Sequence, residues 1–172
     1  MKQGVIWLTG LSGAGKTTLA RALGDWLLAQ GHKVHLLDGD VLRAASPALG
    51  FDHESRHRHI LRTASLAAEL EGKGAIVVAS LISPYRESRQ QARQLCNKFI
   101  EVYVDASLDE CERRDPKGLY RRARAGEIVN FTGVDDAYEP PEKAEIQIPT
   151  AGIPVDQSVR LLLEKVGVWL NA

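Results

Sequence analysis

The sequence predicts an α/β fold in which a five-stranded, mostly parallel sheet is flanked by helices. Short apolar runs alternate with longer segments of helical periodicity, and this alternation is typical of a parallel sheet joined by right-handed crossovers. A glycine-rich turn also separates the first apolar run from the first helical segment. With 172 residues, the chain fits one domain over residues 1–172, with a late lid segment at about 115–141.

The first half of the chain contains three predicted strands and two predicted helices. Glycines close the second helix, and the third strand is almost continuously apolar, as expected of a buried parallel strand. Residues 41–51 are predicted to form a loop because Pro47 and Gly50 interrupt the pattern. In order, the elements are the strand 5–8, the helix from residue 17, the strand 34–37, the helix 52–72 and the strand 75–79.

The second half continues the alternation, with one irregular stretch. Ser107 is a suitable N-cap for a short helix that ends at Arg113. Residues 115–141 have no clear periodicity and mix basic residues with glycines and prolines, so we expect a mobile lid there. The remaining predicted elements are the helix 85–97, the strand 99–104, the short strand 145–148 and the helix 155–170.

Composition excludes several functional classes. The 22 basic and 22 acidic residues give a formal net charge of zero, so we expect neither nucleic acid nor a membrane surface as a partner. No apolar run approaches the roughly 20 residues of a membrane span. Cys96 and Cys111 form neither a disulfide framework nor a metal motif, which fits a reducing compartment. Residues 1–3 lead directly into the first strand without a signal peptide, so a cytoplasmic location is expected.

The glycine-rich turn has the pattern of a phosphate-binding loop. Residues 10–17 read GLSGAGKT, which matches G-x-x-x-x-G-K-[ST] between a strand and a helix. Its three glycines can adopt positive φ and carry no Cβ, so their amides can surround an anion next to the positive end of the helix dipole. Lys16 is expected to reach the β- and γ-phosphates, and Thr17 to offer a hydroxyl to Mg²⁺. The motif therefore predicts binding of a nucleoside triphosphate.

The positions of the carboxylates favour a small-molecule kinase among such proteins. Asp38 and Asp40 follow the second strand and are the best candidates to direct Mg²⁺, with Asp105 a weaker one. The third strand ends without a carboxylate. Residues 97–100 lack the final aspartate of a guanine-specifying N-K-x-D motif, which argues against a switch GTPase.

The basic residues of the lid segment have two interpretations. Arg121, Arg122 and Arg124 are expected to close over the triphosphate and stabilise the transferring phosphoryl group. The alternative is an ordinary solvated basic face.

One further motif suggests a different chemistry. Residues 53–57 read HESRH, and H-E-x-x-H on a helix places two imidazoles one turn apart for zinc. The helix shows no obvious third ligand, because His59 lies two positions after His57 and points elsewhere. The preferred interpretation is a polar helix start with partly exposed histidines.

Six short motifs follow one another in the order found in one known enzyme family. They are WLTGLSGAGKT at 7–17, LDGD at 37–40 with Arg43, LGF at 49–51, ISPYR at 82–86, RDPKGLY at 114–120 and FTGVD at 131–135. On these motifs the chain resembles the adenylylsulfate kinase (APS kinase) family of P-loop kinases over nearly its whole length. The resemblance implies transfer of the ATP γ-phosphoryl group to the 3′-hydroxyl of adenosine 5′-phosphosulfate (APS), which gives PAPS and ADP. It also implies Mg²⁺ as a cofactor and suggests a homodimer.

The resemblance assigns roles residue by residue. The expected nucleotide-binding residues are Gly10, Leu11, Ser12, Gly13, Ala14, Gly15, Lys16, Thr17 and Thr18, with Cys111, Arg114 and Thr150 near the ATP adenine. The expected residues of the APS site are Asp38, Asp40, Arg43, Phe51, Arg56, Ile82, Ser83, Lys117 and Phe131. The expected metal ligands are Thr17 and Asp40, and the expected catalytic residues are Lys16, Asp40 and Ser83.

Physical chemistry indicates what several of these residues do. Phe51 and Phe131 are suited to clamping adenine, although core packing is the alternative for both. Asp40 is placed to take the proton of the 3′-hydroxyl or to order Mg²⁺. Ser83 matches a serine described in the family as a phosphoserine intermediate. We favour direct in-line transfer, in which Ser83 caps a helix and binds substrate, because positioning and charge neutralisation suffice for phosphoryl transfer.

Three positions depart from the family pattern. Val41 and His59 stand where asparagine is usual, and Leu81 where phenylalanine is common. His59 matters most, because an imidazole replaces an amide that can read the nucleotide. Two alternatives follow: a related kinase acting on another nucleotide-linked anion, and a non-catalytic nucleotide-binding module. Four intact residues argue against the second alternative: Lys16, Thr17, Asp40 and Lys117.

Overall fold

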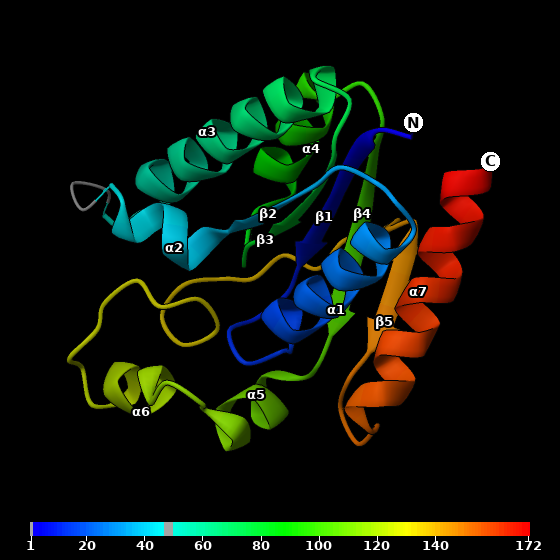
Figure 1. Cartoon of the computed structure of the whole chain (residues 1–172). Coiled ribbons are helices and arrows are strands. Elements are labelled where there is room, and N and C mark those ends of the chain that lie inside the picture. The colour runs from blue at the N-terminus through cyan, green and yellow to red at the C-terminus, as the bar shows by residue number, and fades with distance from the viewer. Residues whose placement is uncertain (1, 47–49) are drawn as a thin grey trace.

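The computed structural model describes residues 2–46 and 50–172, and Figure 1 shows the arrangement of its elements. The elements are β1 (Gly4–Thr9), α1 (Lys16–Ala29), β2 (Val34–Asp38), α2 (Gly39–Ala44), α3 (His53–Gly72), β3 (Ile76–Ser80), α4 (Arg86–Leu95), β4 (Phe99–Asp105), α5 (Leu108–Arg114), α6 (Leu119–Arg124), β5 (Ile146–Pro149) and α7 (Val155–Asn171). Pro47 and Leu49, which entered the loop and motif predictions, lie outside the described residues.

The five strands form one parallel sheet in the order β2-β3-β1-β4-β5. This confirms the predicted α/β fold. The register pairs Leu8 of β1 and Asp38 of β2 with the same residue of β3, Ser80. The carboxyl ends of three neighbouring strands therefore meet at one edge, where ligands bind in open parallel sheets.

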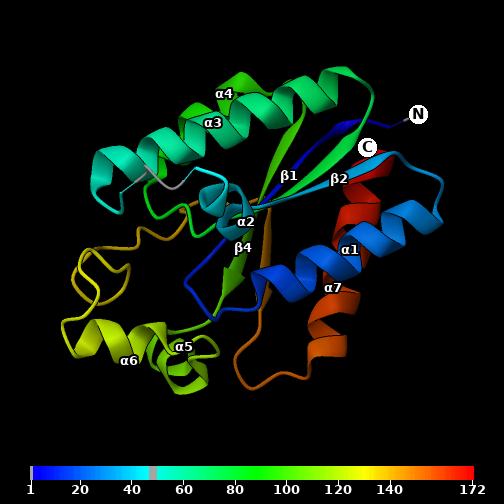
Figure 2. The same cartoon turned by 60° about the vertical axis from the view of Figure 1, so that its left-hand side comes forward.

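Helices cover both faces of the sheet, and β1 contributes to both layers of the core. Ile6 and Leu8 pack in the cluster that includes apolar residues of α1 and α7. Val5 and Trp7 pack in the other cluster, with α3 and α4. All four side chains are fully buried, and this two-sided burial explains why the strand is a continuous apolar run. Figures 1 and 2 show the two termini at the end of the sheet far from α5 and α6.

Two helices begin at N-cap residues of types that are common at helix starts, an aspartate and a serine. The carboxylate of Asp52 accepts a hydrogen bond from the Ser55 amide at 2.9 Å, at the start of α3. The hydroxyl of Ser107 accepts from the Glu110 amide at 3.2 Å, which confirms the predicted cap of α5. Each cap satisfies one of the amides that a helix start leaves without a partner.

Two stretches differ from the prediction. Residues 41–51 were expected to be a loop, but α2 occupies Gly39–Ala44 because the Asp38 carboxylate accepts from the amides of Asp40 and Val41. The lid segment was expected to lack regular structure, but it contains α6, whose first amides bond to the Asp115 carboxylate at 3.0 Å. Each helix has six residues, too few to show a periodicity in the sequence.

Within residues 2–46 and 50–172, no helix has the length and apolar character needed to cross a membrane.

Candidate active site

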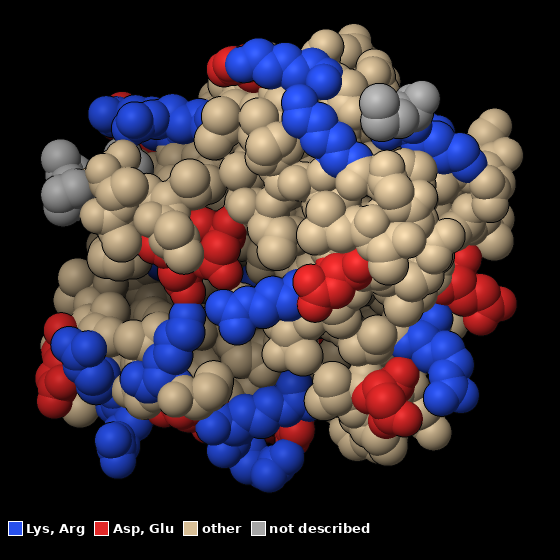
Figure 3. Space-filling view, in the orientation of Figure 1, with Lys and Arg blue, Asp and Glu red and all other residues tan. Residues whose placement is uncertain are grey.

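A cavity of 520 Å³ lies at the carboxyl ends of the strands, bordered by the phosphate loop (residues 10–17), α2 and the N-terminal part of the lid segment. Figure 3 shows a hollow at the left of the molecule, with acidic and basic side chains close together around it. The cavity is lined by most of the predicted site residues: Ser12, Gly13, Ala14, Gly15, Lys16, Thr17, Thr18, Asp38, Asp40, Arg43, Phe51, Arg56, Ile82, Ser83, Arg114, Lys117, Phe131 and Thr150. Among the predicted residues, those that do not line it are Gly10, Leu11, Cys111, the three arginines of α6 and Asp105, whose carboxylate accepts a hydrogen bond from Gln147 Nε2 at 2.8 Å instead.

The glycines of the phosphate loop meet two different requirements. Gly13 and Gly15 have φ values of 79° and 105°, which residues with a Cβ rarely adopt. Gly10 was also expected to use positive φ, but its constraint is space, because a Cβ there would lie 2.6 Å from the Val104 carbonyl oxygen. The loop is thus shaped by its own backbone and by the neighbouring strand β4.

Lys16 is the buried cation of the loop. Its Nζ donates to the carbonyl oxygens of Gly10 at 2.9 Å and Leu11 at 2.8 Å, so these two residues contact the lysine rather than the cavity. Burial lowers the pKa of Lys16 to about 8, an effect that the nearby Asp40 carboxylate partly offsets. The side chain therefore stays mostly protonated at neutral pH, as a partner for phosphate must be.

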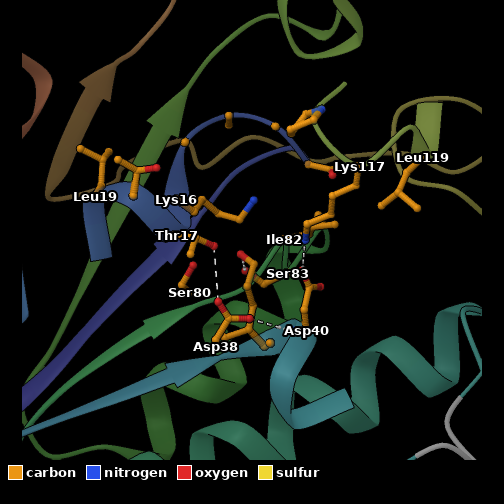
Figure 4. Close-up of a pocket in the computed structure, with 18 of the residues that line it drawn as sticks. Lys16, Thr17, Leu19, Asp38, Asp40, Ser80, Ile82, Ser83, Lys117 and Leu119 are labelled. Carbon is orange, nitrogen blue, oxygen red and sulfur yellow. Dashed lines mark hydrogen bonds and ion pairs between the residues drawn. The ribbon is translucent and has the colours of Figure 1, made fainter. Parts of the chain in front are cut away.

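Carboxylates of the β2–α2 junction face the start of α1. Thr17 Oγ1 lies 3.4 Å from Asp38 Oδ2, while the ammonium of Lys117 forms an ion pair with Asp40. Figure 4 shows both interactions as dashed lines across the cavity. A hydroxyl and carboxylates are the oxygen ligands that Mg²⁺ prefers, so the donor set fits a magnesium–triphosphate complex beside Thr17.

Aromatic and guanidinium groups line the opposite side of the cavity. The Phe51 ring is half exposed, and the guanidinium carbons of Arg43 and Arg56 lie 4.5 Å and 5.6 Å from its centroid. The Phe131 ring is nearly buried and packs edge-on against Tyr120 at 5.0 Å. This side offers flat apolar surfaces next to positive charge, which suits an anionic nucleotide.

Arg56 connects the segments that form this side of the cavity. Its guanidinium donates to the carbonyl oxygens of Phe51 at 2.8 Å and Asn130 at 2.6 Å, and its Nε lies 3.6 Å from the Asp136 carboxylate. Arg56 therefore joins α3 to the far end of the lid segment.

Ser83 has an unusual backbone conformation for a residue with a side chain. Its φ is 42°, and its hydroxyl accepts from Trp7 Nε1 at 3.1 Å and donates to the Leu81 carbonyl oxygen at 3.2 Å. We expected Ser83 to cap a helix, and this is wrong. Helix α4 begins at Arg86, and its N-cap residue, Tyr85, provides no side-chain hydrogen bond.

Arg114 and Thr150 stabilise the phosphate loop through hydrogen bonds to its carbonyl oxygens. Arg114 donates to the carbonyl oxygens of Gly13 at 3.1 Å and Thr150 at 2.9 Å, and Thr150 Oγ1 donates to the Ala14 carbonyl oxygen at 2.7 Å. Cys111 lies behind the loop, fully buried in the core.

The three arginines of α6 do not line the cavity. Arg122 pairs with Glu127 at 3.1 Å, and Arg124 pairs with Glu112. In this structure they form the solvated basic face that we considered as the alternative, and Lys117 is the lid cation that reaches the cavity.

The histidines of α3 do not form a metal site. The ring of His53 stacks on Tyr85 at 4.0 Å, and His57 Nδ1 shares a hydrogen bond of 2.7 Å with Ser88 Oγ. No group of three or more His, Cys, Asp or Glu residues that could hold a metal occurs in residues 2–46 and 50–172.

Several residues that line the cavity had no assigned role in the site from the sequence. His59 is one, and burial together with the charge of Arg43 lowers its pKa to about 4. The sequence signal for His59 was its position, because it stands where the family usually has an asparagine. The others are mainly apolar and come from segments far apart: Leu19, Gly39, Ile60, Ser80, Leu81, Pro84, Pro116, Leu119, Ile153, Val155 and Ser158.

Comparisons with known proteins agree on one family. A family model described as Adenylylsulphate kinase matches residues 2–149. The adenylyl-sulfate kinase of Aeromonas hydrophila is 52% identical over 162 residues, which cover 92% of this chain and 82% of that protein. The structure of the Mycobacterium tuberculosis APS kinase CysC in complex with AMPPNP and APS has a TM-score of 0.90 and 36% identity, covering 96% of this chain and 98% of that one. A hexameric APS kinase from Thiobacillus denitrificans has a TM-score of 0.72 and 32% identity, covering 98% of this chain and 29% of that one.

Proposed function

The chain belongs to the adenylylsulphate kinase family of P-loop kinases and is an adenylyl-sulfate kinase, and we propose how its cavity performs the reaction. The γ-phosphoryl group of ATP passes to the 3′-hydroxyl of APS, which yields PAPS and ADP. One observation supports this proposal most strongly. A single continuous cavity is lined by the phosphate loop at one end and by Phe51, Arg56 and Phe131 at the other.

The phosphate-loop end binds ATP. The amides of residues 13–17 surround the β-phosphate at the positive end of the α1 dipole, and Lys16 leaves its loop carbonyls for the phosphate oxygens. Thr17, with the help of Asp38 and Asp40, would hold Mg²⁺, which would neutralise charge on the triphosphate. Arg114 stabilises the conformation of the loop by donating a hydrogen bond to the Gly13 carbonyl oxygen.

The other end binds APS. The adenine lies between the faces of Phe51 and Phe131, and Arg43 and Arg56 supply positive charge for the phosphosulfate. Asp40 lies on α2 at the boundary of the two ends, where it accepts the proton of the attacking hydroxyl. Lys117, already paired with Asp40, contributes charge to the transferring group.

The contacts of Ser83 support direct transfer over a phosphoserine intermediate. A serine nucleophile needs a base within hydrogen-bond reach of its hydroxyl. The two groups bonded to Ser83 Oγ are the Trp7 N–H, which is a donor, and the Leu81 carbonyl, which is not a useful base. Ser83 is therefore assigned to positioning the acceptor.

The test is ADP release measured with a panel of acceptors. APS is expected to support turnover, while AMP, adenosine 5′-phosphate esters without sulfate, and nucleotide-linked sugars are expected to support little. Preference for one of these other anions would favour the related-kinase alternative, in which His59 changes the acceptor. If none of the acceptors in the panel supports ADP release, a non-catalytic nucleotide-binding module is favoured.

We also infer that the protein is a homodimer, as the family resemblance suggests. The relative from Thiobacillus denitrificans is a hexameric APS kinase, so the test must separate a dimer from larger assemblies. Sedimentation equilibrium distinguishes a dimer from a monomer of 18.9 kDa or a larger assembly.

A further inference from the structure

Arg89 of α4 is a buried arginine that the reaction described above does not use. Its side chain is 3% exposed, and it does not line the cavity. A buried guanidinium is costly unless its charge and its N–H groups find partners. Arg89 finds three: Glu101 Oε1 at 2.6 Å, the Ser83 carbonyl oxygen at 2.7 Å and the Glu139 carbonyl oxygen at 2.7 Å.

One of the two carbonyls is that of Ser83, the residue with the unusual positive φ. A non-glycine residue at φ 42° persists only where its surroundings hold it there. Arg89 holds the carbonyl of Ser83, and Trp7 holds its hydroxyl. Thr9 Oγ1 adds a bond to the preceding carbonyl, that of Ile82, at 2.7 Å.

The second carbonyl lies where the lid segment rejoins the body of the protein. Glu139 also donates its amide to the Pro84 carbonyl oxygen at 2.7 Å, and the Tyr138 hydroxyl lies 2.9 Å from Thr9 Oγ1. Residues 82–84 and 138–139 therefore share two partners, Thr9 and Arg89. One end of the lid segment and the Ser83 turn are connected in the same buried network.

We propose that Arg89 is a positioning residue, which holds Ser83 in its left-handed conformation and ties that conformation to the end of the lid segment. The proposal rests on the function assigned to the cavity above. It places the effect on the acceptor side only, because no contact of Arg89 reaches the phosphate loop.

The test is Arg89→Lys, with Arg93→Lys as the matched control. Lysine keeps a positive charge opposite Glu101 but lacks the planar fork that donates to three acceptors at once. Arg93 lies one turn further along α4 and bonds to Glu145 and the Phe99 carbonyl, with no contact to Ser83. Arg89→Lys is expected to lower kcat/KM for APS about tenfold or more, with KM for ATP changed less than twofold. Arg93→Lys is expected to change neither constant by more than twofold.

A second measurement does not depend on turnover. In the ligand-free Arg89→Lys protein, amide hydrogen exchange is expected to become faster in residues 81–85 and 137–140 together, and to stay unchanged in the phosphate loop. Faster exchange in only one of the two segments overturns the coupling. If wild-type protein fails to turn over APS, the assigned function fails, and the exchange experiment still decides the role of Arg89.

Poor folding of Arg89→Lys does not end the test. Tyr138→Phe removes one hydroxyl from the same network and leaves the ring in place. It is expected to raise KM for APS or lower kcat by a few fold without changing KM for ATP. Equal changes in the constants for ATP and APS, in this variant or in Arg89→Lys, contradict a positioning role.

Discussion

The phosphate loop and the acceptor side of the cavity differ in how the chain brings their residues together. The phosphate loop is one run of neighbours, residues 10–17, with a shape fixed by its own φ angles and by contact with β4. The acceptor side is assembled from α2, α3, residues 82–83 and two points of the lid segment. Substitutions in the loop therefore act on the chemistry directly, whereas substitutions on the acceptor side also act through long-range contacts.

The charged groups next to the phosphates also differ in burial, between Lys16 of the loop and the Asp40–Lys117 pair at the boundary of the two regions. Lys16 is almost completely buried, and burial lowers its pKa to about 8. Asp40 and Lys117 pair across the cavity with both side chains more than half exposed. A charge shielded from water interacts more strongly with phosphate than an exposed one, so the largest effects are expected in the loop.

The largest expected effect is that of Lys16→Ala. Removal of this ammonium from the phosphates should lower the rate of PAPS formation on the order of 10³-fold or more. Initial rates with saturating ATP and APS measure the loss, and thermal melting checks that the fold is intact. Turnover close to wild type would sink the assignment of residues 10–17 as the phosphate site.

Next comes Asp40→Asn, which tests the boundary between the two regions. The amide cannot accept the proton of the 3′-hydroxyl and binds Mg²⁺ less well, so the rate should fall about 10²-fold or more. Asp109→Asn, at an exposed position in the first turn of α5, is the control for a neutralised aspartate. If both variants lose activity equally, Asp40 has no special role.

Ser83→Ala should have a smaller effect, because in direct transfer it costs one or two hydrogen bonds. A loss of about 1–2 kcal/mol corresponds to roughly 5–30-fold in rate. Mass spectrometry after incubation with ATP alone should show no phosphate on Ser83. A dead variant, together with phosphoserine that chases into PAPS, would overturn direct transfer.

The pH dependence of stability tests the buried imidazole of the acceptor side. The pKa of His59 is lowered to about 4 in the folded protein, against an ordinary value near 6.5, so the unfolded chain binds the extra proton first as pH falls. The free energy of unfolding should therefore drop between pH 7 and pH 5, by about 1–2 kcal/mol from this residue. Urea titrations should show a shallower drop for His59→Asn than for wild type or for His32→Asn, whose imidazole lies outside the cavity. Parallel pH profiles for all three proteins would contradict the burial argument.

The smallest expected effect concerns the lid segment. Residues 115–141 should exchange amide hydrogens faster without ligand and become protected by a few fold or more when ADP and APS bind. The change should be largest in residues 115–127, because the other end is held by Arg56 and Arg89. Equal exchange in the free and bound protein would exclude a lid.

The sequence by itself determined the features that depend on neighbouring residues. The phosphate loop, the alternation of strands and helices and the Ser107 cap all follow from backbone preferences and local hydrogen bonds, which leave patterns within a few positions. The family motifs also identified most of the residues that line the cavity.

Only the tertiary structure decided how these residues are supported. The three partners of Arg89, the burial of His59 in the cavity and the pairing of Lys117 with Asp40 join positions up to 77 residues apart. The helices α2 and α6 are six-residue segments with no visible period, and an aspartate accepts hydrogen bonds from amides in the first turn of each. Contacts of this kind form because folding removes water from groups that must then find partners, and the choice of partner depends on the packing of the whole sheet.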